Sequence, residues 1–177
     1  MPGVDVARVL RGARDLMNTN GRHWIKGDMV REVDETLIEW RDNNNGSGVI
    51  VSPKAQVGDV AYCAWGGIAE IADDLELRVE AMEALVQIID PQGYSYYEDE
   101  QNEEYENWKV EFEYSKQNSD SWYATRYPTF GHLYAEQLDS REEILGDRIA
   151  TWNDDDKRTW AEVRDSLTKA AAKAKRK

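Results

Sequence analysis

The stretch Tyr62-Cys63-Ala64-Trp65-Gly66-Gly67-Ile68-Ala69-Glu70-Ile71 mixes large aromatic residues with very small ones and ends near a single acid. This composition is typical of a buried helix whose small residues let neighbouring backbone come close. Gly66 and Gly67 each lower helix stability by about 1 kcal/mol relative to alanine, so we expect that a close approach requires them. Asp59 is the predicted N-cap, and four residues are predicted to face inward: Tyr62, Cys63, Ile68 and Ile71.

A second stretch, residues 152–163, is the predicted packing partner of this helix. Thr159-Trp160-Ala161-Glu162 is a capping box, in which the threonine side chain and the glutamate each satisfy a free backbone amide. We expect Trp65 and Trp152 to be largely buried, because each lies among small or capping residues. Asp154-Asp155-Asp156 is interpreted as a structural loop rather than a cation site, since three adjacent acids do not converge on one ion unaided.

Apolar spacing of three and four residues predicts the remaining helices. One covers residues 5–18, with Asp5 as its N-cap, and another covers residues 75–89 and ends at Asp90-Pro91, since the residue before proline avoids helical geometry. A capping box at Ser140-Arg141-Glu142-Glu143 is predicted to open a helix that ends near Thr151. The final helix starts at Trp160, and its basic end, residues 170–177, is expected to fray.

Residues 29–52 are open to two interpretations. Val30, Val33, Leu37 and Trp40 fit one face of a helix, whereas residues 36–40 and 49–51 fit two strands around a polar loop. We favour the hairpin, because Val49-Ile50-Val51 is β-branched and ends at Pro53.

Residues 91–128 differ from the rest in being acidic and rich in tyrosine; eight of the nine tyrosines lie between Tyr94 and Tyr134. Between Trp108 and Ser115, apolar and polar residues alternate, which is typical of a strand with one wet face. Residues 121–127 are the candidate partner strand. The pattern predicts an inserted acidic hairpin.

Composition sets the broad class of the protein. The 177 residues suit a single domain, residues 1–177, with an α+β fold: a mainly helical core and one or two small antiparallel β-hairpins. The net charge of -13 argues against direct binding to nucleic acid. The single cysteine fits a reducing cytosol, and neither a signal peptide nor a membrane span is visible, so we expect a cytoplasmic protein.

Few residues in the chain suggest catalysis or ligand binding. His23 and His132 are the only histidines, and neither has metal-ligand spacing, so we expect neither a metal nor a cofactor. Cys63, on an apolar helix, is expected to be an inert core thiol, because a catalytic thiolate needs a lowered pKa and a nearby base.

Four short motifs carry a resemblance: Trp24 to Gly27, Cys63-Ala64-Trp65-Gly66, Trp152-Asn153-Asp154, and Arg158-Thr159 before a final helix. With the N-terminal amphipathic helix, they make the chain resemble an uncharacterised domain of unknown function from actinobacteria and their phages. The resemblance implies a small intracellular protein that is often phage-borne, and it implies no activity. The region from Gly93 to Pro128 departs from the family pattern.

The acidic, tyrosine-rich segment is the best candidate for function. Tyrosine offers rigid amphipathic contact area, and acids can steer a basic partner. The sequence favours a non-enzymatic module that binds a host or phage protein, through seven residues: Tyr96, Tyr97, Glu98, Glu100, Glu103, Glu104 and Tyr105. The alternatives are an acidic mimic of nucleic acid that inhibits a DNA-binding protein, and a small enzyme with a site near Cys63 and Asp154.

Overall fold

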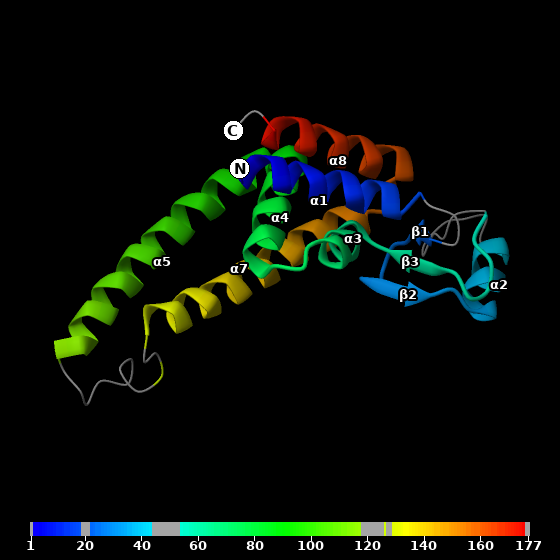
Figure 1. The fold of residues 1–177 in the computed structure, drawn as a ribbon. Helices are drawn as coiled ribbons and strands as arrows, with labels where there is room; N and C mark the ends of the chain where they lie inside the picture. The colour runs from blue at the N-terminus through cyan, green and yellow to red at the C-terminus, as the bar shows by residue number, and fades with distance from the viewer. Residues whose placement is uncertain (1, 19–21, 44–53, 118–125, 127–128, 176–177) are drawn as a thin grey trace.

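A computed structural model describes residues 2–18, 22–43, 54–117, 126 and 129–175. The fold is mainly helical with one small sheet, so the predicted α+β class is confirmed (Figure 1). Within those residues, no helix has the length and apolar character needed to cross a membrane.

Five helices contribute most of the main core: α1 (Pro2–Leu16), α3 (Ala64–Ile71), α4 (Leu75–Ile89), α7 (Phe130–Asn153) and α8 (Trp160–Ala174). The apolar stripe predicted for the first helix is buried along its whole length, from Val6 to Met17. The predicted bounds of α4 are confirmed. The helices α1, α4 and α8 pack against one another because each presents one apolar stripe to the others.

The sheet has three short strands, β1 (Arg22–Trp24), β2 (Val30–Glu32) and β3 (Val60–Tyr62), in the order β1-β3-β2. β1 runs parallel to β3, with Trp24 opposite Tyr62, and β2 runs antiparallel to β3, with Val30 opposite Tyr62. The helix α2 (Glu35–Asn43) separates β2 from β3 along the chain, and a second, small core lies beneath it: Ile25, Val33, Leu37, Ala55 and Ala61.

The hairpin favoured for residues 36–51 is therefore wrong at its first strand, because residues 36–40 belong to α2. The predicted second strand, residues 49–51, lies outside the described residues. Val33, just before α2, and Leu37, within it, are both buried. Their spacing of four residues is typical of one face of a helix. The side chain of Asp34 accepts the Leu37 amide, as an N-terminal cap does, and this bond lowers the pKa of Asp34.

Gly66 is confirmed as a point of close approach. A Cβ atom there would overlap the backbone carbonyl of Met29, just before β2. The same carbonyl oxygen accepts the amide of Cys63 at 3.0 Å, so β2 is held directly against the start of α3. The approach at Gly67 is less close: a Cβ atom added there would lie 3.1 Å from Cε of Met17, the residue that follows α1.

The helix α3 begins at Ala64, and its N-cap is Cys63 rather than the predicted Asp59. Residues 60–62 form β3 and separate Asp59 from the start of α3, so Asp59 is unable to cap that helix. Asp59 instead accepts the amide of Gln56 at 2.8 Å and lies 2.8 Å from His23 Nε2. Those two contacts, the amide first, lower the pKa of the Asp59 carboxyl.

Residues 91–117 form one long helix, α5 (Pro91–Gln117), so the predicted hairpin is wrong over this segment. Trp108 and Phe112 are four residues apart and face inward, whereas Val110 and Tyr114 are exposed. An alternating pattern contains such four-residue pairs, so a short run of it fits either structure. Of the predicted partner strand 121–127, only residue 126 is described.

Two predicted helix ends are also corrected. Ser140 lies inside α7, which starts ten residues earlier, so it opens no helix. The basic end of the chain does not fray from residue 170, because α8 continues to Ala174, with Ala170, Ala171 and Ala174 buried against the main core. The small alanine side chains let α8 pack closely against the main core. The alanine- and lysine-rich composition of residues 170–177 does not indicate this packing.

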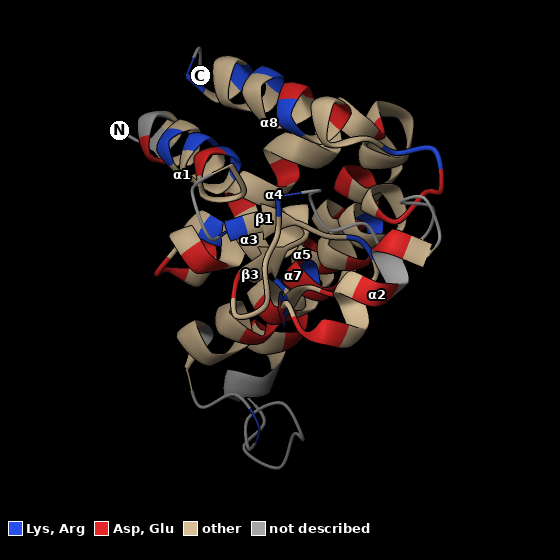
Figure 2. Cartoon of the chain, turned by 90° about the vertical axis from the view of Figure 1, so that its right-hand side faces the viewer, with Lys and Arg blue, Asp and Glu red and all other residues tan. Residues whose placement is uncertain are grey.

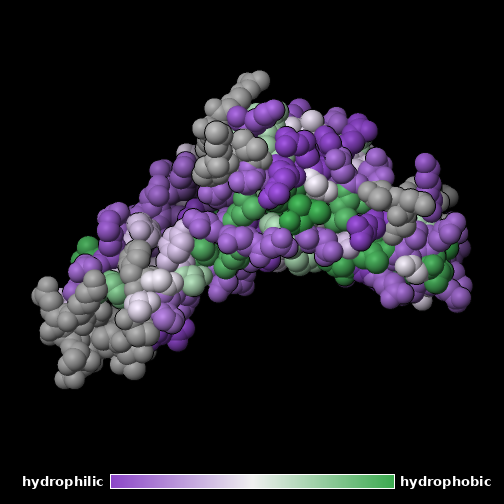
Figure 3. Space-filling model, in the orientation of Figure 1, coloured by the Kyte–Doolittle hydropathy of each residue, from purple (hydrophilic) through white to green (hydrophobic). Residues whose placement is uncertain are grey.

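The second half of α5 and the first half of α7, residues 98–117 and 129–141, extend away from the body and are called the arm (Figure 1). A small separate cluster joins the two helices there: Trp108, Phe112 and Leu133. On the face shown in Figure 3, the arm is mostly hydrophilic, whereas hydrophobic side chains gather over the middle of the body.

Candidate functional site

Asn153, at the end of α7, is fully buried and joins three separate segments. Its Oδ1 accepts the indole N–H of Trp24 at 2.7 Å and the amide of Ala64 at 3.4 Å. Its Nδ2 donates to the carbonyl of Ile25 at 3.0 Å. A buried amide of this kind is stable only when its donors and acceptors are paired, and here they are.

The turn after β1 is fastened to the loop between α7 and α8. The amide of Gly27 donates to Asp154 Oδ1 at 2.9 Å. Lys26 is 3% exposed, and its Nζ donates to the carbonyls of Asp155 and Asp156 at 2.7 and 3.2 Å. These carbonyl oxygens replace the water molecules that the ammonium group of Lys26 loses on burial.

The loop closes on itself through Arg158. Its guanidinium lies over the ring of Trp152, at 4.5 Å from the ring centre, and its Nε donates to the Trp152 carbonyl. Trp152 and Trp65 are partly buried against the core, less enclosed than predicted. The capping box of Thr159 and Glu162 is confirmed, with both reciprocal bonds present.

These contacts define the junction: residues 24–27, 63–66, 152–156 and 158–159. It unites all four motifs that carry the sequence resemblance. Most of the motif residues bond to one another, and Trp152, Asp155 and Arg158 also line a pocket with residues of α4 and α7. The junction therefore explains the motifs as parts that hold three segments together.

Cys63 has the surroundings of a structural thiol. The side chain is 3% exposed, and its Sγ accepts the Gly66 amide at 3.4 Å. Burial raises the pKa of the thiol, and the nearby charge of Asp154 acts in the same direction. A catalytic cysteine needs the opposite shift. Within the described residues, no group of three His, Cys, Asp or Glu side chains is arranged to hold a metal ion.

A second candidate site is the outer face of α5. Ten exposed residues share this side of the helix: Tyr96, Asp99, Glu100, Glu103, Glu106, Asn107, Val110, Glu111, Glu113 and Tyr114. Three are large and apolar or aromatic, with exposed fractions of 70% for Tyr96, 67% for Val110 and 61% for Tyr114. Tyr96, Glu103 and Val110 recur every seven residues, about two helical turns, so they lie along one line.

The structure divides the seven predicted partner-binding residues. Tyr96, Glu100 and Glu103 lie on the outer face of α5. Tyr97 is 2% exposed, and its hydroxyl accepts a bond from Arg141 of α7, so it is unable to act as a surface anchor. The others are spread around the helix: Glu98 is exposed on the side nearest α4, and Glu104 and Tyr105 are partly buried.

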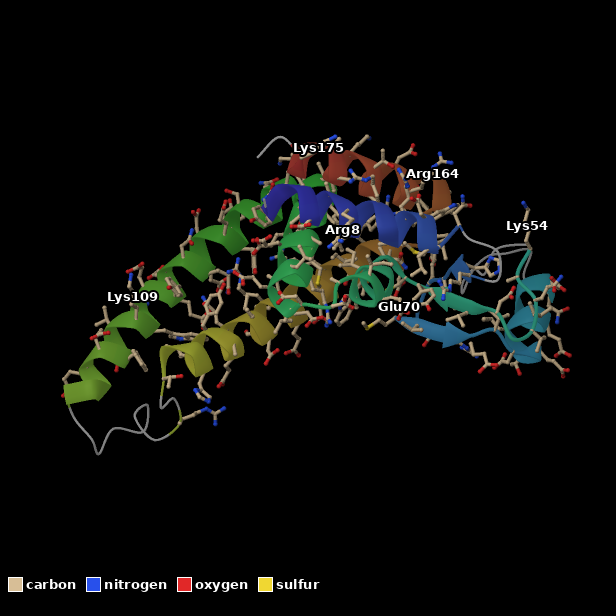
Figure 4. The ribbon with its side chains drawn as sticks, in the orientation of Figure 1. Arg8, Lys54, Glu70, Lys109, Arg164 and Lys175 are labelled. Carbon is tan, nitrogen blue, oxygen red and sulfur yellow. The ribbon has the colours of Figure 1, made fainter. Side chains whose placement is uncertain are left out.

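The outer face lies on the most acidic helix of the chain. The residues of α5 include eight acids and two bases. Lys109, one of the two, pairs with Glu106 and extends outward from the arm in Figure 4. Figure 2 shows basic and acidic residues mixed on α1 and α8, and mainly acidic residues on α2.

Val110, Tyr114 and Asp99 were missed as members of this face, although a signal was present. Six large or buried residues follow helical spacing along the inner side: Tyr94, Tyr97, Gln101, Tyr105, Trp108 and Phe112. Steps of three and four residues over this length indicate a helix and place the exposed residues on the opposite side. The alternation after Trp108 is short and fits this helix as well as a strand.

Comparison with known proteins gives one result. A model of a family described as a family of unknown function, DUF6197, matches residues 1–173. No curated protein and no solved structure matches the chain.

Proposed function

The chain belongs to DUF6197, a family of unknown function, and we propose that it is a protein-interaction module that binds a basic partner through the outer face of α5. The observation that carries the proposal is the exposure of Tyr96, Val110 and Tyr114 on one side of a helix whose opposite side is buried. Single exposed apolar residues need no explanation, but three large ones on the same side of one helix indicate a contact surface.

The partner's chemistry follows from the charges around these three residues. Six acids on the same face repel any acidic surface and attract a basic one over a range of about 8 Å at physiological salt. Tyr96 and Tyr114 would supply the buried contact area, and Asp99, Glu100 and Glu103 would speed association. Following the resemblance to phage-borne proteins, we propose that the partner is a protein of the host or of the phage.

The experiment compares two variants with the same change in charge. The arm variant carries Asp99→Asn, Glu100→Gln and Glu103→Gln, and the control carries Glu32→Gln, Glu35→Gln and Glu39→Gln on β2 and α2. All six acids are exposed, so neither variant should lose stability. Partners are captured from an actinobacterial lysate on wild type, arm variant and control in parallel.

We expect a protein that wild type and control retain and the arm variant loses. With that protein purified, the arm variant should associate about tenfold more slowly at low salt, and its rate should depend less on salt. A second variant, Tyr96→Ala with Tyr114→Ala, should dissociate faster, with association nearly unchanged. Equal retention on all three proteins would remove the outer face of α5 from the interface.

The acidic-mimic alternative is favoured by the density of charge on the same face. The six acids of the outer face lie between Asp99 and Glu113, a length of about 21 Å at 1.5 Å per residue. That is about one charge per 4 Å, close to the 3.4 Å per phosphate of one DNA strand. If the protein is such a mimic, duplex DNA should compete with it for the partner, and replacing Tyr96 and Tyr114 should not weaken partner binding.

The enzyme alternative near Cys63 and Asp154 has less support. The pKa of the thiol is raised, and the Asp154 carboxylate is used by the Gly27 and Asn153 N–H groups. These contacts favour a structural role for both residues.

A further inference from the structure

A cavity of about 330 Å³ lies where α1, α4, α5 and α8 meet. The helix ends that surround it come together at the top of the body, where both chain termini lie (Figure 1). It is separate from the junction and from the outer face of α5. Its volume is in the range of pockets that hold small ligands.

The cavity exists because small residues occupy positions where helices usually fill the space between them. Gly3 of α1, Ala84 of α4 and Ala174 of α8 all line it and contribute little bulk. Val6 and the ring of Tyr94 complete an apolar wall. Tyr94 stays a neutral phenol at physiological pH, since burial and the charge of Glu83 raise its pKa to about 12.

The charged residues of the cavity are mostly acids. Glu80, Glu83 and Glu98 face a single base, Lys173. Glu80 and Glu83 lie three residues apart on α4, so both project from the same side of that helix. Glu83 is paired with Arg141, whereas neither Glu80 nor Glu98 has an ion-pair partner among the residues that the structure describes.

Glu80 also lies in an unfavourable setting for a lone carboxylate. Burial, followed by the charges of Glu76 and Asp74, raises its pKa above the ordinary value. A bound cation would relieve this penalty, because an opposite charge favours the ionised carboxyl. An anion would meet the same acids and be repelled.

We propose that this cavity binds a small organic cation, an aliphatic diamine. One ammonium group would lie at Glu80 and the other at Glu98, and the carbon chain between them would lie against Val6, Ala84 and Tyr94. An amine fits better than a metal ion, because a metal needs several oxygen ligands at 2.0–2.6 Å, and the described residues form no such group.

The test uses three probes of one length: cadaverine, 1,5-pentanediol and glutarate, which are cationic, neutral and anionic. Binding to the full chain is measured by calorimetry and by the shift in melting temperature. We expect cadaverine to bind at least tenfold more tightly than pentanediol and glutarate not to bind. Equal binding of cadaverine and pentanediol would overturn the proposal.

Two variants locate the binding. Glu80→Gln with Glu98→Gln should weaken cadaverine about tenfold per carboxylate. The control, Glu35→Gln with Glu70→Gln, has the same charge change on α2 and α3, and should bind as wild type does; Glu70 lies far from the basic end of α8 in Figure 4. Ala84→Leu, which fills the cavity and keeps every charge, should abolish binding.

Unchanged cadaverine affinity in the Glu80 and Glu98 variant would show that the amine binds elsewhere, and would refute the site even if Ala84→Leu failed to fold. The arm variant of Asp99, Glu100 and Glu103 should bind cadaverine normally. Failure of the α5 interaction and failure of this site are thereby distinguishable.

Discussion

The junction and the arm use long polar and aromatic side chains in opposite ways. In the junction, Trp24, Lys26 and Asn153 are buried, and each polar end has a partner on another segment. In the arm, Asn107 and Tyr114 are exposed, and only the opposite side of α5 packs on its neighbours. Aromatic and polar side chains thus stabilise the fold in the junction and are free to contact a partner in the arm.

The difference shows what the four short motifs of the junction report. A short motif with unusual residues marks a place where the backbone or a buried polar group has strict requirements. In this chain those requirements belong to packing: Gly66 to the Met29 carbonyl, and Asn153 to Trp24 and Ile25. The exposed residues of α5 have no such requirement and form no motif.

The largest effect should come from the junction amide. Asn153→Leu keeps a similar volume but leaves the Trp24 indole N–H and the Ile25 carbonyl without partners, each at about 1–3 kcal/mol. We expect a loss of about 3–5 kcal/mol in urea unfolding. Asn107→Leu, on the exposed side of the arm, should change stability by less than about 0.5 kcal/mol. Similar losses in both variants would contradict the contrast between the regions.

A pair of glycine substitutions should sharpen the contrast by giving opposite signs. Gly66→Ala forces a methyl group against the Met29 carbonyl and should destabilise by about 1–3 kcal/mol despite alanine's better helix propensity. Gly131→Ala, in the first turn of α7 in the arm, meets only Thr129 Oγ1 at 3.6 Å and should stabilise by up to about 1 kcal/mol. Melting curves of the two variants check this; a stable Gly66→Ala protein would disprove the close approach.

The smallest effect concerns two threonine N-caps. Thr159 caps α8 at the junction with a full capping box, whereas Thr129 caps α7 in the arm without a side-chain bond to the helix amides. Thr159→Ala should cost about 1 kcal/mol, and Thr129→Ala less. Chemical denaturation at neutral pH measures both, and equal losses would contradict the assignment.

The Thr159 variant also has a pH signature. Bonds from the Thr159 amide and hydroxyl lower the pKa of Glu162 in the folded protein. A carboxyl group whose pKa is lowered by folding stabilises the protein at pH values above its pKa in the unfolded chain. That stabilisation is lost as the pH falls through the pKa of the group in the folded protein. In Thr159→Ala the pKa of Glu162, followed by NMR, should therefore rise, and the stability difference from wild type should shrink on acidification. The backbone amide bond remains in this variant, so an unchanged pKa would show that the Thr159 hydroxyl does not hold the Glu162 carboxylate.

The sequence by itself determined those features that depend on neighbours along the chain. The stripe of α1, the bounds of α4 and the capping box at Thr159 follow from spacing, the Asp90-Pro91 stop and local hydrogen bonding. The need for close approach at Gly66 was also readable, because a glycine pair in an apolar helix is costly without a reason. The acidic, tyrosine-rich character of residues 91–117 was clear, although its helical state was misjudged.

Only the tertiary structure decided which of these side chains are buried. Tyr96 and Tyr97 are adjacent and identical in type, yet α7 covers one of them and leaves the other exposed. Asn153 became an anchor because β1 and the start of α3 lie next to it, 89 and more residues away in sequence. The cavity required four helices to meet at Gly3, Ala84 and Ala174. Contacts between distant segments depend on how whole helices pack, and local sequence patterns carry no record of that packing.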